Sequence, residues 1–70
     1  MAVKLSTTQL AILRTAVDQG EASIFNGGNH RAAYVLVRLG LVTMKHYPHD
    51  HVLPTESGRA YIADARVSWD

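Results

Sequence analysis

The chain has 70 residues, 47% hydrophobic and 19% charged, with a formal net charge of +1 at pH 7 and no cysteine. These values are typical of one small globular domain, argue against intrinsic disorder, and exclude disulfides, thiolate metal sites and thiol catalysis. No apolar run approaches the roughly 18 residues that span a bilayer, and the first residues lack the layout of a signal peptide, so we expect a single cytoplasmic domain over residues 1–70. A charge this close to zero is weak support for nucleic-acid binding, although the placement of charges matters more than their sum.

The first predicted helix runs from Thr7 to about Gln19. Ser6 is a good cap for its first turn, and Gln9, three residues later, completes a capping box. Gly20 supplies the stop. Apolar residues repeat at helical spacing and form a broad stripe: Leu10, Ile12, Leu13, Ala16 and Val17. We expect this helix to have a structural role.

The connection from residue 21 to residue 28 is too short for another ordinary helix. Ile24 and Phe25 favour a short extended segment, and Asn26, Gly27 and Gly28 form a strong turn signal. Glycines just before a helix start leave backbone amides that can hold a phosphate, but the spacing matches neither the Walker nor the dinucleotide fingerprint. We therefore interpret the glycines as turn residues.

Residues 29–41 combine a helix start, a helix stop and two chemically different faces. Asn29 is a good N-cap, Gly40 suits the left-handed position just past a helix end, and Leu41 is the apolar residue that packs back after such an ending. One set at helical spacing predicts a buried stripe: Ala33, Leu36, Val37 and Gly40. Another set repeats that spacing on a second face: Arg31, Tyr34, Val35 and Arg38. The second face is either ordinary solvated surface or a surface that touches a partner.

A β-hairpin is predicted over about residues 42–53. From Val42 to Tyr47 apolar and polar residues alternate, with Val42 and Met44 on one side. Residues 48–50 form a turn, and the returning strand ends before Pro54. The flanks of this turn gather groups able to contact phosphate or ribose: Lys45, His46, Tyr47, His49 and His51.

Three of these residues, His46, His49 and His51, also suggest a metal site, because imidazole is a common ligand of zinc, copper and nickel and Asp50 can add an oxygen. A hairpin tip offers no obvious second shell to fix the rings. We therefore favour exposed turn histidines and predict no metal ligand.

The last predicted helix runs from Glu56 to about Arg66, with Thr55 as its N-cap. Its apolar side is formed by Tyr61, Ile62 and Ala65, and the small residues Gly58, Ala60 and Ala63 would let another helix approach closely. Trp69 either folds back on the core or stands exposed as an anchor. Tyr61 and Trp69 are the candidate contacts to a partner or a second copy.

The order helix, short strand, helix ending in Gly, hairpin, helix predicts an α+β fold, a compact winged helix-turn-helix. Three segments also resemble small bacterial and phage winged-helix DNA-binding domains of the broad MarR-like kind: residues 5–13, residues 37–42 and residues 53–60. The most specific motifs are the LxxxGLV helix end and the LTxxGR start of the last helix, here with Pro54 inserted before Thr55. The segment before residue 29 is too short for the family's usual separate second helix, so the resemblance implies a minimal version.

The resemblance implies a recognition helix over about residues 29–39 in the DNA major groove, with the wing reaching the backbone or the minor groove. The helix positions that would face DNA are His30, Arg31, Tyr34 and Arg38, and the wing positions are Lys45, His46, His49 and His51.

The leading functional hypothesis is thus a DNA-binding transcriptional regulator that contacts double-stranded DNA, acting as a homodimer on a two-fold site because one module with so few cations would bind weakly. The alternative is a winged-helix protein-interaction module, for example a phage-encoded modulator of a host protein, favoured by the near-neutral charge and by Tyr34, Val35, Leu39 and Trp69. We expect no enzyme and no cofactor, because the chain has no paired carboxylates and no Ser beside a His and an acid. A metal-responsive regulator is a minor variant.

Overall fold

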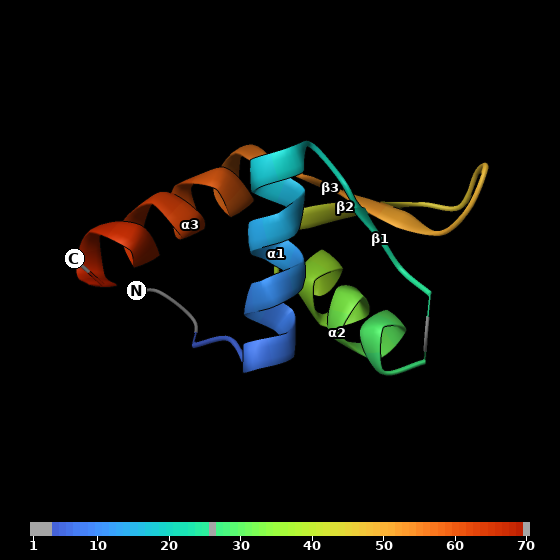
Figure 1. The fold of residues 1–70 in the computed structure, drawn as a ribbon, viewed down its shortest axis with the longest axis horizontal. Helices are drawn as coiled ribbons and strands as arrows, with labels where there is room; N and C mark the ends of the chain where they lie inside the picture. The colour runs from blue at the N-terminus through green and yellow to red at the C-terminus, as the bar shows by residue number, and fades with distance from the viewer. Residues whose placement is uncertain (1–3, 26, 70) are drawn as a thin grey trace.

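The computed structural model describes the backbone of residues 4–25 and 27–69, and side chains within this range as far as residue 64. Its elements are α1 (Thr7–Gln19), β1 (Ala22–Ser23), α2 (Gly27–Arg38), β2 (Val42–Lys45), β3 (His51–Pro54) and α3 (Glu56–Trp69) (Figure 1). The three strands form one antiparallel sheet in the order β1-β3-β2. Over the described residues this is the predicted α+β, winged-helix arrangement of three helices, a short strand and a hairpin. None of the helices in this part of the chain is both long and apolar enough to cross a membrane.

Helix α1 begins and ends where its local signals place it. The Ser6 hydroxyl accepts a hydrogen bond from the backbone N–H of Gln9 at 3.2 Å, and the Ser6 N–H donates to the Gln9 side chain at 3.0 Å. These reciprocal bonds satisfy N–H groups that have no partner within the helix. Gly20 ends the helix in the left-handed region, with a φ of 88°. The predicted boundaries of α1 are confirmed.

Helix α2 begins two residues earlier than predicted. Gly27 and Gly28 are helical rather than turn residues, and Asn29 lies half-buried in the first turn instead of capping it. The glycines with positive φ in the described chain are Gly20 and Gly40. Asn26 lies outside the described residues.

The end of α2 follows the prediction. Gly40 has a φ of 77°, its N–H donates to Val37 O at 3.0 Å, and the N–H of Leu41 donates to Leu36 O at 3.0 Å. This pair of bonds is a Schellman ending, and Leu41 is buried as such an ending requires.

The buried side of α2 is rotated from the predicted one. Ala32, Ala33 and Leu36 are buried, whereas Val37 is 36% exposed. The helix packs on α1 as well as on β2, and the two alanines let it approach closely, so the stripe shifts toward its N-terminal half. The predicted burial of Val37 is wrong.

The first strand of the hairpin is shorter than predicted, and the second strand is longer. β2 ends at Lys45, and β3 continues through Pro54, which pairs with Val42. Inward and outward positions alternate as expected, with Val42 buried, Met44 half-buried, and Thr43 and Lys45 exposed. The inner face joins one hydrophobic core: Ile12, Leu13, Ala16, Ala22, Ile24, Ala32, Ala33, Leu36, Leu41, Val42, Val52 and Ile62.

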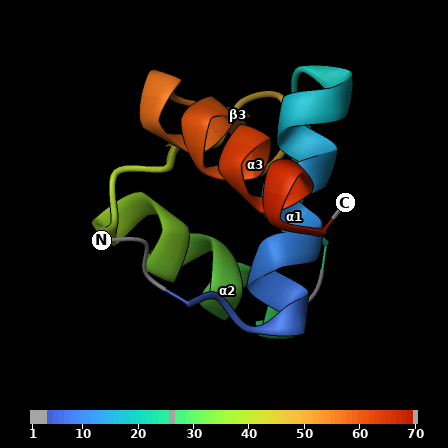
Figure 2. The ribbon, with the colours of Figure 1, turned by 90° about the vertical axis from the view of Figure 1, so that its left-hand side faces the viewer.

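Helix α3 is fastened to the end of α2. The N–H of Thr55 donates to Leu41 O at 3.0 Å, and its hydroxyl donates to Gly40 O at 2.6 Å. The same hydroxyl accepts from the N–H of Gly58 at 3.1 Å, so Thr55 caps α3 as predicted. Gly58 is buried against Leu41 and Leu13, which leaves no room for a side chain. The helix lies across α1 (Figure 2).

Candidate nucleic-acid interface

Helix α2 presents the predicted reading residues on its outer side. Arg31, Tyr34 and Arg38 are exposed, and their spacing of three and four residues places them on one face. Tyr34 is 52% exposed. The hairpin projects at the end of the molecule opposite the end of α3, with the first turn of α2 beneath it (Figure 1). The first turn of α2 and the hairpin therefore lie at the same end of the domain.

Asp50 joins this helix to the hairpin. Its Oδ2 accepts a hydrogen bond from Nε2 of His30 at 2.6 Å, and its Oδ1 accepts one from Nδ1 of His46 at 2.9 Å. The hydrogen bonds from His46 and then His30 lower the pKa of Asp50 below its ordinary value. His30 is only 28% exposed, so its side chain braces the hairpin against α2 rather than standing open to a base edge.

The other two histidines lie on the opposite face of the sheet. Ala22 and Val52 pair across the ladder and are buried, so the next pair, Ser23 and His51, points away from the core. His49 lies on the same outer side as His51. The centroids of the two rings are 5.3 Å apart. The four histidines thus form two separate groups, His30 with His46 and His49 with His51.

The outer pair has partners that hold its rings. Nδ1 of His51 donates to the His49 carbonyl at 2.8 Å, and Nε2 of His49 lies 3.1 Å from the Ser23 hydroxyl. The ring of Phe25 stacks on that of His49, with centroids 6.2 Å apart and 17° between the planes.

A different set of potential metal ligands results. Glu21, His49 and His51 each offer a ligand atom within 4.8 Å of the others. The set considered from the sequence, His46, His49 and His51 with Asp50, is not brought together, because His46 and Asp50 bond to each other on the helix side of the sheet. Glu21 was not predicted to belong to this group, because it reaches the two histidines only through the pairing of β1 with β3.

No protein family, curated protein or solved structure matches the chain. Its function is therefore inferred from its own residues.

Charge is distributed unevenly along the chain. Residues 27–54, which contain α2 and the hairpin, hold three Lys or Arg and one Asp, a formal charge of +2, and all four histidines. The remaining residues hold four Lys or Arg and five Asp or Glu, a formal charge of −1. The one acid of the positive segment is Asp50, whose carboxylate is bonded to two histidines. The formal charge of +2 comes from Arg31 and Arg38 on α2, because Lys45 and Asp50 cancel within the hairpin.

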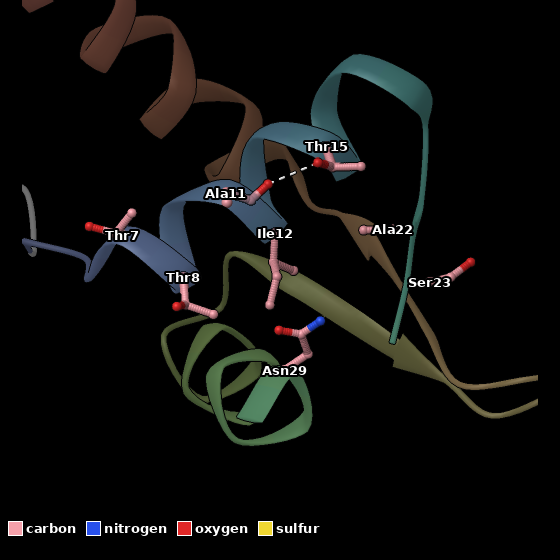
Figure 3. Close-up of a pocket in the computed structure, with 8 residues that line it drawn as sticks. All are labelled: Thr7, Thr8, Ala11, Ile12, Thr15, Ala22, Ser23 and Asn29. Carbon is pink, nitrogen blue, oxygen red and sulfur yellow. Dashed lines mark hydrogen bonds between the residues drawn. The ribbon is translucent and has the colours of Figure 1, made fainter. Parts of the chain in front are cut away.

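A shallow groove lies between α1, β1 and the start of α2. Thr8, Ile12 and Asn29 point toward one another where α1 passes the first turn of α2 (Figure 3). The lining offers hydroxyl and amide groups above an apolar floor and contains no ionisable side chain: Thr7, Thr8, Ala11, Ile12, Thr15, Ala22, Ser23 and Asn29. A neighbouring groove shares Thr8 and Asn29 and adds Arg31.

Several apolar side chains are also exposed. Phe25 is 80% exposed and Tyr47 is 89% exposed, at the end of the molecule that carries the hairpin turn. On α2 and just after it, Val37 and Leu39 are 36% and 38% exposed. Tyr61, one of the two predicted partner contacts, is half-buried against the core. The side chain of Trp69, the other, lies outside the described residues.

Proposed function

We propose that the protein binds double-stranded DNA through α2 and the hairpin, as a cytoplasmic transcriptional regulator. The observation that carries the proposal is the exposed face of Arg31, Tyr34 and Arg38 on a helix that packs against the hairpin. An α-helix with its side chains is about 10–12 Å in diameter and fits the major groove, which is about 12 Å wide.

In this proposal the two arginines supply the main contacts to DNA. Guanidinium groups bind phosphate oxygens and the major-groove edge of guanine in a two-pronged geometry. Lys45 is exposed on the edge strand β2, where its flexible ammonium can contact a phosphate. Thr8 and Asn29, beside Arg31 at the grooves along α1, add neutral groups of the kind that position a DNA backbone.

His30, His46 and Asp50 act as positioning residues. Their two hydrogen bonds fix the turn of the hairpin relative to the first turn of α2. A wing held in this way loses less conformational freedom on binding than a free loop does. His46 keeps 66% of its side chain exposed and can also contact DNA directly.

The test is a fluorescence anisotropy titration of a labelled random-sequence duplex at low salt. Arg31→Ala and Arg38→Ala should each weaken binding by about fivefold or more, corresponding to about 1 kcal/mol. Arg59→Ala is the matched control, because Arg59 is an equally exposed cation on α3. Binding that is unchanged in both α2 variants, or weakened equally by Arg59→Ala, contradicts the proposed face.

A protein partner is the second candidate, and exposed apolar residues favour it. Tyr34, Val37 and Leu39 are exposed apolar residues on and just beyond α2, and aromatic and aliphatic anchors with few charges are enriched in protein interfaces. Retention of a partner from host lysate after nuclease treatment, and its loss in Leu39→Ser but not in Arg38→Ala, would support this candidate over DNA.

A further inference from the structure

Strand pairing gathers three metal-ligating side chains on the outer face of the sheet. Ser23 lies opposite His51 in the ladder, so Glu21, two residues before Ser23, follows the same outward alternation. His49 precedes His51 by two residues and lies beside it. One carboxylate oxygen of Glu21 and one ring nitrogen from each histidine are within 4.8 Å of one another.

We propose that Glu21, His49 and His51 bind a first-row transition-metal ion, for which Zn²⁺ is the best fit. Two imidazoles and a carboxylate form a common zinc ligand set, with ligand distances of about 2.0–2.2 Å. In a tetrahedral site such ligand atoms are about 3.3 Å apart. Glu21 and His49 are exposed, so small rotations of their side chains close the set around an ion.

Neighbouring groups already orient the two rings. The Nδ1–H of His51 donates to the His49 carbonyl at 2.8 Å, which leaves Nε2 with the lone pair that a metal requires. The Ser23 hydroxyl at 3.1 Å and the stacked Phe25 ring hold His49 over β1. These contacts provide the second shell that a hairpin tip was expected to lack.

The positive charge of Lys45 would repel a metal ion bound nearby. Lys45 pairs with His51 from the other side of the ladder, so its ammonium group belongs to the same face. Its side chain is exposed and flexible and can turn toward solvent, away from Glu21 on the far strand. The carboxylate of Glu21 supplies the negative charge that the two neutral imidazoles do not.

Binding would clamp the hairpin turn to β1. Among the described residues, the ladder between β1 and β3 consists of the pairs Ala22–Val52 and Ser23–His51, with a further bond from Ile24 N–H to Asp50 O at 2.9 Å. Glu21 lies at one end of this short ladder and His49 lies past the other end. A metal ion bound to both would connect the two ends. The ion would therefore stabilise the folded chain. It would reduce the motion of the hairpin more than that of the rest of the domain.

The test uses tag-free, chelator-treated protein titrated with ZnCl₂ and followed by thermal melting, calorimetry and NMR of the imidazole resonances. At about a hundredfold excess over the dissociation constant, Zn²⁺ should raise the melting temperature by roughly 10–20 °C. Glu21→Gln, His49→Gln and His51→Gln should each weaken binding by at least about tenfold, in line with the loss of one ligand. His46→Gln is the control, because His46 lies on the other side of the sheet.

Each outcome decides the proposal. A shift retained in His46→Gln and lost in the three ligand variants supports it, with NMR changes centred on His49 and His51. An absent shift in the wild-type protein overturns it, as does a shift lost in His46→Gln but kept in Glu21→Gln. Because the assay contains no DNA, its result is independent of the proposed DNA binding.

Discussion

Replacing Gly58 by alanine tests how tightly α3 is seated on the rest of the fold. A methyl group at this position would collide with Leu41 O, a backbone atom that cannot turn aside, and would lie 3.1 Å from Cδ1 of Leu13. Relief of the collision requires α3 to move. That movement would strain the bond from Thr55 N–H to Leu41 O, which joins the helix to the end of α2.

The expected cost follows from three terms. Overpacking costs about 1–3 kcal/mol. A weakened hydrogen bond adds about 1 kcal/mol, and the better helix propensity of alanine returns up to about 1 kcal/mol. The free energy of unfolding should fall by about 2–3 kcal/mol, and the melting temperature by roughly 10–20 °C for a domain of this size.

Thermal and urea denaturation, followed by circular dichroism, measure the effect. Gly27→Ala is the matched control: nothing lies within 4 Å of the added methyl group and the residue is helical. This control should be neutral or stabilising by up to about 1 kcal/mol. A Gly58→Ala variant that melts within about 2 °C of the wild type would refute the close packing of α3 against Leu41.

Two further predictions concern single side chains. Ser6→Ala removes the acceptor for Gln9 N–H and should lower the free energy of unfolding by about 1 kcal/mol in urea denaturation, whereas Thr7→Ala, one residue later and equally exposed, should not. The pKa of Asp50 is lowered by the hydrogen bonds from His46 and His30, so its contribution to stability is present above its unfolded pKa of about 3.9 and lost as the pH falls through the lower folded pKa. Melting temperatures measured from pH 5 to pH 2 should therefore fall less steeply in Asp50→Asn than in the wild type, and parallel curves would contradict the assignment.

Capping residues were sufficient to predict the end of a helix where that end depends on residues close to it in the sequence. Ser6, Gln9 and Gly20 define α1, and Gly40 with Leu41 defines the end of α2, because capping bonds form within a few residues. The start of α2 was misjudged because an Asn before two glycines suits a turn and a helix start equally well. Local chemistry does not choose between them.

The errors elsewhere come from contacts between distant segments. The burial of Val37 depends on where α1 and β2 press on α2, which helical periodicity alone does not specify. Residue spacing grouped His46, His49 and His51 at the hairpin turn, but His46 bonds to Asp50 on one side of the sheet, and His49 and His51 lie together on the other. Glu21 joins His49 and His51 only through the pairing of β1 with β3. The sequence therefore drew attention to the histidines, but it did not reveal how they are grouped or that Glu21 joins two of them.

The salt dependence of DNA binding tests the central proposal most directly. The logarithm of the association constant should fall linearly with the logarithm of salt concentration, because each phosphate contact releases counterions. If Arg31 and Arg38 both contact phosphates, the slope for the Arg31→Ala, Arg38→Ala double variant should be shallower than the wild-type slope by about 2, with Arg59→Ala unchanged. Equal slopes in the wild type and the double variant, or no binding to duplex DNA at low salt, would contradict a DNA-binding role for α2.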